Sequence, residues 1–328
     1  MNYYSGLFTE HRRQIEEQGL KHTLSVCAVL CIISALLSYT LSIVYYIFFN
    51  SGGADRYGNY SAVYCIRYFL FIGLISVIST ALPFACASHT LGGMDKLYPL
   101  HRTKPLYTLG MIFIGMGACM FFQNLSGFWD KALSFFGYTS NQILPYCNNG
   151  IVTILLFLML AVIPALVEEF VYRGAILHAL KDYGTGMAII ISAVLFGLGH
   201  FSLSTTPFAF LSGLIFGFIT IKSQSLIPTV LIHILNNTYA IIYNVFCTKS
   251  TSEIIFIMNT VIPCLFILSG LAAFIIFVCK DKHFLRFEKS SMLLSCKEKT
   301  YTVLSNGGLL VFVLLFLLLM IIPLLNIG

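Results

Sequence analysis

Residues 151–180 read IVTILLFLMLAVIPALVEEFVYRGAILHAL. This run is long enough to cross the hydrocarbon core of a bilayer, which needs about 20 predominantly apolar residues. Its ionisable side chains include Glu168, Glu169 and Arg173, which lie well inside the run. Charged groups within a membrane span are costly, and they usually mark a functional site. The run therefore predicts a transmembrane helix that contains functional residues.

The composition of the whole chain supports a membrane protein. Of its 328 residues, 58% are hydrophobic and 10% are charged, and the mean hydropathy is +0.88. Soluble domains carry about 25% charged residues, so the composition excludes a soluble globular protein. The net charge of +6 comes from scattered cations, and no nucleic-acid partner is expected. The expected fold is an all-α, polytopic bundle of transmembrane helices.

Nine apolar segments have about the length of a membrane span. They are residues 22–49, 64–88, 106–124, 151–180, 187–204, 207–221, 226–246, 254–279 and 306–326. Within the sixth, Gly213 and Gly217 form a small-xxx-small face, which predicts close helix packing. The sequence thus predicts about nine spans.

These segments fall into three regions. Residues 1–149 form an N-terminal membrane region with three spans, residues 150–246 a core of four helices, and residues 247–328 a C-terminal region with two spans. Most lysines and arginines fall on one side if the N-terminus is cytoplasmic, as the positive-inside rule requires. The loop 280–303 is the most basic, and we expect it to contact anionic lipid headgroups. The expected location is a cell membrane, with the bacterial cytoplasmic membrane preferred because the loops are compact.

Strongly polar groups within the four core spans gather into three short motifs. They are Glu168-Glu169-x-x-x-Arg173, Phe196-x-x-x-His200 and His233-x-x-x-Asn237.

The first motif separates its two carboxylates by helical geometry. Glu169 and Arg173 are four residues apart, so they share a helix face and can form an ion pair. Glu168 lies about 100° around the helix and has no such partner. Pro164, one turn earlier, could bend this helix and open a water-accessible pocket. We therefore take Glu168 as the candidate for chemistry.

The other two motifs are predicted to lie at about the same depth in the membrane as Glu168. His233 and Asn237 share one helix face, and Phe196 lies beside His200 on another. Counted along their helices at 1.5 Å per residue, Glu168, His200, His233 and Asn237 all fall about 10–20 Å below the cytoplasmic surface. We expect these four groups to converge. Asn236 points about 100° away from Asn237 and is interpreted as helix packing.

In this order, the three motifs resemble those of the CPBP family. This family of intramembrane proteases, also called Abi, comprises CAAX prenyl endopeptidases and bacteriocin-processing enzymes. The resemblance covers about 150–246 and implies an endopeptidase, dependent on glutamate or metal, that cleaves a membrane-associated or prenylated peptide or protein. It leaves the substrate, the biological pathway and the oligomeric state open.

By the same resemblance, each motif residue has an expected role. Glu168 would be the general base that activates water, and His200 would position that water. His233 and Asn237 would donate hydrogen bonds to the oxyanion formed at the scissile carbonyl. The structural support would come from Glu169, Arg173 and Phe196.

A metal is the main chemical alternative. Two histidines and one carboxylate also suit a zinc ion with an open position for water, so Glu168, His200 and His233 are possible ligands of a divalent metal. The chain has no His-Glu-x-x-His motif, and any such site would be assembled from three helices. The sequence leaves metal-free and zinc-dependent catalysis open.

Two non-peptidase functions use the same residues. Glu168 and the two histidines could form a proton or cation site in a transporter. The chain shows one polar cluster and no matching second set, unlike transporters built from inverted repeats. A non-catalytic immunity or scaffold protein could also keep the motifs for packing, although each polar group is costly to retain in lipid.

Overall fold

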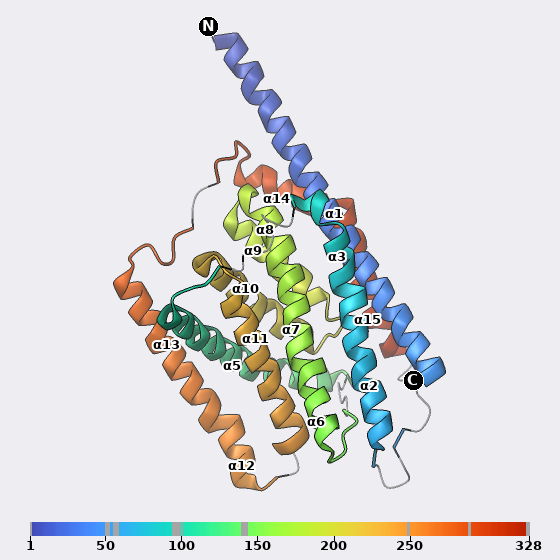
Figure 1. The fold of residues 1–328 in the computed structure, drawn as a ribbon. Coiled ribbons are helices and arrows are strands. Elements are labelled where there is room, and N and C mark those ends of the chain that lie inside the picture. The colour runs from blue at the N-terminus through green and yellow to red at the C-terminus, as the bar shows by residue number, and fades with distance from the viewer. Residues whose placement is uncertain are drawn as a thin grey trace.

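The computed structural model describes residues 2–49, 53–54, 59–93, 99, 101–138, 144–247, 250–287 and 290–325, with side chains described between residues 8 and 320. The chain folds into a bundle of helices in which α1 projects beyond the rest at its N-terminal end (Figure 1). This confirms the all-α prediction.

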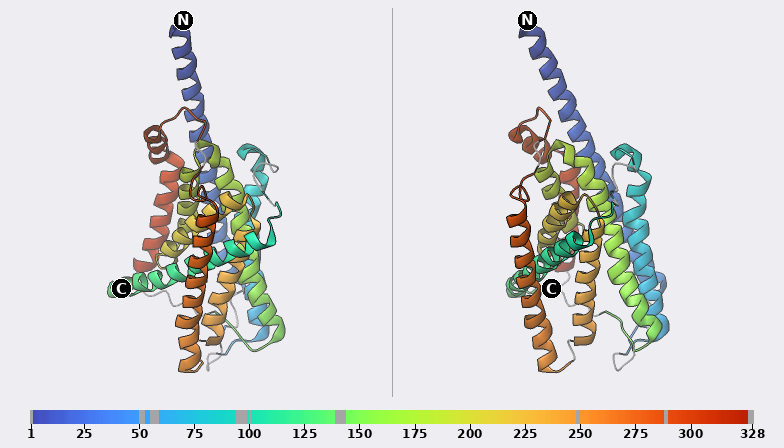
Figure 2. Two further views of the ribbon diagram at one scale, coloured as in Figure 1. Left: turned by 90° about the vertical axis from the view of Figure 1, so that its left-hand side faces the viewer. Right: turned by 60° about the vertical axis from the view of Figure 1, so that its left-hand side comes forward.

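The N-terminal region contains one long helix, one segmented helix and one oblique helix. In chain order they are α1 (Asn2–Phe49); α2 (Ala62–Ile75), η1 (Ser76–Ala81), α3 (Leu82–Cys86) and η2 (Ser88–Leu91); and α5 (Pro105–Phe135). Figure 2 shows α5 running across the direction of the other helices. Gly117 of α5 makes this crossing close, because a Cβ there would stand 3.1 Å from the Cα of Gly270 on α13 (Ile262–Lys280).

The middle region contains the helix of the opening sequence and the three helices that follow it. The first consists of α6 (Gly150–Phe157), η3 (Leu158–Val162), α7 (Ile163–Glu168), η4 (Glu169–Leu177), α8 (His178–Leu180) and η5 (Lys181–Tyr183). It is followed by α9 (Thr185–Leu198), by α10 (Thr205–Ser223), and by α11 (Ile227–Ile241) with η6 (Ile242–Cys247). Asn149 begins this region by accepting hydrogen bonds from the N–H groups of Ile151 and Val152.

Pro164 lies next to wider helical turns. The segments η3 and η4, on either side of α7, are π-helical. Because Pro164 has no N–H group to donate, the regular α-helical ladder is interrupted near it. Such π turns are frequent at functional sites.

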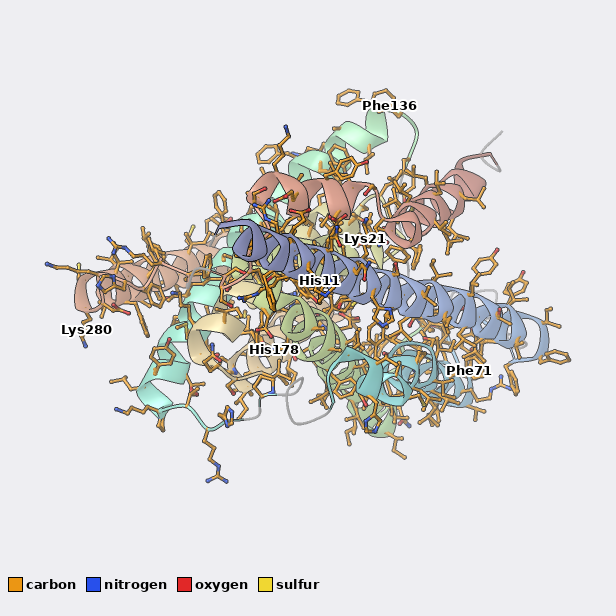
Figure 3. The ribbon with its side chains drawn as sticks, turned by 90° about the horizontal axis from the view of Figure 1, so that it is seen from above. His11, Lys21, Phe71, Phe136, His178 and Lys280 are labelled. Atoms are coloured by element: carbon orange, nitrogen blue, oxygen red, sulfur yellow. The ribbon has the colours of Figure 1, made fainter. Side chains whose placement is uncertain are left out.

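The C-terminal region contains α12 (Ser252–Phe256), η7 (Ile257–Val261), α13 (Ile262–Lys280), α14 (Cys296–Leu304) and α15 (Gly307–Leu325). Ser295 and Glu298 form a capping box that begins α14. Seen from above (Figure 3), the end of α13 at Lys280 and the end of α5 near Phe136 lie on different edges of the bundle.

Among the described residues, seven helices are long and apolar enough to cross a membrane, or up to eight if α14 and α15 form one bent span. The count of nine is therefore not confirmed. The difference arises at two predicted spans. At 187–204, α9 ends at Leu198 and is too short, and 306–326 counts as a span only if α15 is taken together with α14. Phe201 follows with φ of 45°, a left-handed conformation that a helix cannot contain.

The small-residue face on α10 packs closely, as predicted. A Cβ added to Gly213 would lie 3.0 Å from Ala193 of α9, and one added to Gly217 would lie 3.1 Å from Ile189. The two helices therefore approach with little side-chain volume between them. This contact holds α9 against α10, and both helices also contact η4 in the helix that carries both glutamates.

Candidate active site

Glu169 lies at the centre of the polar cluster and is fully buried. Its Oε1 accepts a hydrogen bond from Arg173 Nη1 at 3.0 Å and another from His233 Nδ1 at 3.0 Å. The first contact is the predicted pair four residues apart. The second joins η4 to α11, so one carboxylate oxygen holds two of the three motifs together.

Arg173 is also fully buried, and two aromatic rings enclose its guanidinium. The guanidinium carbon lies 4.3 Å from the centre of the Phe196 ring and 5.1 Å from that of Phe216. Its Nη2 donates to the carbonyl of Gly213 at 3.4 Å. Desolvating a charge without a partner costs several kcal/mol, roughly, so the ion pair and the ring faces together compensate this burial.

Glu168 faces the other nitrogen of His233. Its Oε2 lies 3.6 Å from His233 Nε2, and its side chain is 23% exposed, whereas that of Glu169 is 0% exposed. Within the described part of the chain, Glu168 Oε2 is buried without a hydrogen-bond partner. Glu168 is thus the carboxylate that combines partial access with an unsatisfied oxygen.

His233 has a defined orientation. Because a carboxylate only accepts hydrogen bonds, Nδ1 of His233 carries the hydrogen that it shares with Glu169. Its Nε2 then faces Glu168. The rings of Phe196 and Phe216 lie 5.9 Å and 5.4 Å from the imidazole, centre to centre, and hold it from two sides.

His200 is connected to this cluster by the ring of Phe196, which contacts both histidines. Its imidazole contacts Phe196 edge to face at 4.9 Å, and Phe196 contacts His233 in the same way. Its Nδ1 donates to the Phe196 carbonyl at 2.8 Å, which leaves Nε2 as the acceptor of the neutral ring. His200 is exposed, and among the described residues it forms no hydrogen bond or ion pair with Glu168.

The two adjacent asparagines differ from each other in burial. Asn237 is partly exposed one turn beyond His233, whereas Asn236 is 8% exposed. The burial of Asn236 agrees with its interpretation as a packing residue, although its Oδ1 has no hydrogen-bond partner among the described groups. The structure therefore brings together Glu168, Glu169, Arg173, Phe196 and His233, with His200 beside Phe196 and Asn237 on the helix of His233.

The loop that carries His200 is held by helices from outside the middle region. The carbonyl of Leu203 accepts a hydrogen bond from Trp129 Nε1 at 2.7 Å, and Ser204 Oγ donates to Asp130 Oδ1 at 2.5 Å. On another side, Phe201 contacts Phe312 and Phe316 of α15, each at 6.2 Å between ring centres. Sequence reasoning missed these anchors; the one usable signal was Asp130, the single carboxylate in α5.

We expect Trp129→Phe to slow any reaction that uses His200 by about fivefold, the effect of losing one hydrogen bond of about 1 kcal/mol. The ring is kept and only the N–H group that holds Leu203 is lost. Turnover of the purified protein and its unfolding midpoint measure the two effects. Phe128→Tyr, an exposed change on the preceding residue, is the control. Unchanged turnover would show that this bond does not position the loop.

Gly199, the residue before His200, meets Tyr172 of η4. A Cβ at Gly199 would collide with the Tyr172 hydroxyl and lie 3.1 Å from the carbonyl of Leu195. The ring of Tyr172 also packs edge to face against Phe196 at 5.1 Å. The sequence shows no feature of Gly199 that would reveal this contact, because it depends on how η4 and α9 pack.

Gly199→Ala should displace His200 and lower turnover, because the added methyl group overlaps Tyr172. Adding Tyr172→Phe should restore part of the loss, since it removes the atom in conflict. Gly127→Ala is the matched control, because nothing lies within 4 Å of a Cβ there. Equal turnover of Gly199→Ala and Gly127→Ala would contradict this interpretation.

The candidate metal ligands do not form a three-ligand site here. Among the described residues, no group of three His, Cys, Asp or Glu side chains is placed to hold a metal ion. Glu168 and His233 are close, but His200 meets His233 only through the ring of Phe196, which contacts both imidazoles. The donor set therefore does not fit a three-ligand zinc site.

The structure and the site define a class: a multi-helical membrane protein with a paired glutamate, arginine and histidine cluster buried among its helices. Residues 150–239 match the family described as type II CAAX prenyl endopeptidase, Rce1-like. This segment is therefore an Rce1-like domain of the CPBP, or Abi, family, as the three motifs indicated. Comparisons with curated proteins and with solved structures gave no match.

Proposed function

We propose that the protein is an intramembrane endopeptidase that cleaves a peptide bond in a membrane-associated or prenylated substrate. The observation that carries the proposal is the placement of Glu168 beside His233, whose orientation is fixed by the buried pair of Glu169 and Arg173. The match of residues 150–239 to a family of endopeptidases supports the same activity.

In the proposed reaction, Glu168 takes a proton from water as the water oxygen attacks the scissile carbonyl carbon. The carbonyl oxygen becomes an oxyanion, and hydrogen bonds from His233 and Asn237 stabilise it. When the carbon–nitrogen bond breaks, Glu168 returns the proton to the leaving amine. His200, held by Phe196, orients the attacking water.

The charges of the buried groups can balance even though two glutamates are present. Arg173 neutralises one of the two carboxylates, so a cluster of Glu168, Glu169, Arg173 and His233 is neutral when it holds one further proton on Glu168 or His233. When this proton is on His233, Nε2 becomes a donor and Glu168 is free to act as a base. The buried pair thus allows a basic carboxylate to exist inside a membrane at low electrostatic cost.

The direct test uses the full chain in proteoliposomes with an internally quenched peptide. One version ends in a prenylated cysteine followed by three residues, and a second version carries the same sequence without the lipid. Cleavage of the first version, with products identified by mass, supports a prenyl-protein endopeptidase. Cleavage of both supports a broader peptidase. Proton flux without any cleavage would favour the transporter alternative, and neither activity would favour the non-catalytic one.

We expect the cleavage to withstand metal chelators, because the proposed steps use only Glu168, His200, His233 and Asn237. Dialysis against a chelator, followed by assay with and without added zinc, measures this. A thermal unfolding scan of both samples separates loss of a metal from loss of the fold. Loss of turnover that zinc restores would make a metal site the better explanation, with its ligands rearranged from the described positions.

A further inference from the structure

A cavity of about 860 Å³ lies at one end of the bundle, away from the glutamate cluster. Its walls come from the end of the Glu168 helix at Lys181, from the last turn of α10 at Lys222, and from the segment after α13 at Arg286. The mechanism proposed above uses none of these residues.

The lining of this cavity is strongly cationic. Lys181, Lys222 and Arg286 contribute basic side chains, and Asp182 is the single carboxylate among its lining residues. The hydroxyl groups of Thr185 and Ser291 also line it, and His283 adds an imidazole. Cations and hydroxyl donors around one space are the groups that bind a phosphate.

Several contacts fix the walls of the cavity in place. Lys222 Nζ donates to the Arg286 carbonyl at 2.5 Å, and it lies 5.3 Å from the centre of the Phe287 ring. Ser290 Oγ donates to the carbonyl of Asp182 at 2.9 Å. The segment after α13 is thus tied both to α10 and to the end of the Glu168 helix.

The cavity lies where several candidate membrane spans end, and a lipid headgroup lies at the same depth. The candidate spans Gly150–Tyr183, Thr206–Ser223 and Ser252–Lys280 all end next to it. Apolar side chains stand beside the cations, since Ile221 and Phe287 also line the cavity. A lipid places its phosphate where spans end and its acyl chains along the apolar helices, so it meets both kinds of lining group.

We propose that this cavity binds the phosphate headgroup of an anionic phospholipid. The sequence predicted general contact between the basic loop 280–303 and such lipids; the structure assigns a particular site shared by Lys181, Lys222 and Arg286. A lipid bound there would link the helix of Glu168 to α10 and to the segment after α13. The proposal does not depend on the peptidase activity.

The test measures phosphatidylglycerol binding to the full chain in neutral detergent by native mass spectrometry. Replacing both Lys181 and Arg286 with glutamine should weaken binding by about 25-fold, because each cation contributes about fivefold. Arg286→Gln alone should weaken it by about fivefold. Both side chains lie at the surface of the cavity, and unfolding midpoints measured without lipid check that both variants fold.

The control variant combines Arg102→Gln and Lys104→Gln, which remove two exposed cations outside the loop 280–303 and outside the cavity. It should bind phosphatidylglycerol as the unmodified chain does, and phosphatidylcholine should bind all variants equally. An equal loss in the control would show that only overall charge matters and would overturn the site. Displacement of the lipid by inorganic phosphate at equal concentration would identify a soluble-anion site and would also overturn the proposal.

Discussion

Glu168→Gln should abolish peptide cleavage while the protein stays folded. Glutamine keeps the size and shape of the side chain but cannot take a proton from water. Loss of a general base lowers the rate by about 100- to 10,000-fold. Turnover of the prenylated peptide at equal protein concentration measures the effect. The free energy of unfolding should change by less than about 1 kcal/mol, because Glu168 is only partly buried.

Glu253→Gln is the matched control, because Glu253 is an exposed carboxylate at the start of α12. It should leave turnover unchanged. The same pair of variants can be used in cells, by comparing the termini of membrane-associated peptides at equal protein abundance. Cleavage by Glu168→Gln at the normal rate would remove the proposed base and, with it, the proposed mechanism.

The local part of the site was predictable from the sequence. The spacing of Glu169 and Arg173 predicts their ion pair, and the structure has it at 3.0 Å. The same spacing separates Glu168 from this pair, and its side chain is indeed the more exposed of the two glutamates. Contacts between residues four apart depend only on helix geometry, which the sequence determines.

The contacts between helices were not predictable in the same way. The bond between Glu169 and His233 joins η4 to α11, and it requires the relative rotation of both helices. The sequence therefore assigned Glu169 to structural support with Arg173 alone. Its second role, orienting the imidazole that faces Glu168, appears only once the helices are placed.

The span count shows a further limit of hydropathy. Residues 199–204 are mildly apolar and continue the run of α9, but Phe201 has a positive φ and the helix has already ended. Hydropathy measures how apolar a segment is and contains no information on backbone conformation. The loop that results carries His200, and its anchors, Trp129 and Asp130, belong to α5.

Arg173→Met should have the largest effect on stability, because it leaves Glu169 charged and fully buried without its cation. Breaking a buried ion pair by removing one partner costs about 3–5 kcal/mol. Methionine keeps an unbranched apolar side chain between the rings of Phe196 and Phe216, so packing is largely preserved. The midpoint of thermal unfolding in detergent measures the loss, and Arg102→Met, at an exposed position, should cause none.

The double variant Glu169→Gln with Arg173→Met separates stability from activity. Removing both charges removes the unpaired buried carboxylate, so much of the lost stability should return. Turnover should not return with it, because a neutral amide in place of the Glu169 carboxylate no longer helps His233 to carry a proton beside Glu168. A stable and inactive double variant would show that the buried pair orients and charges the histidine. A double variant that regains full turnover would show that the pair serves the fold alone.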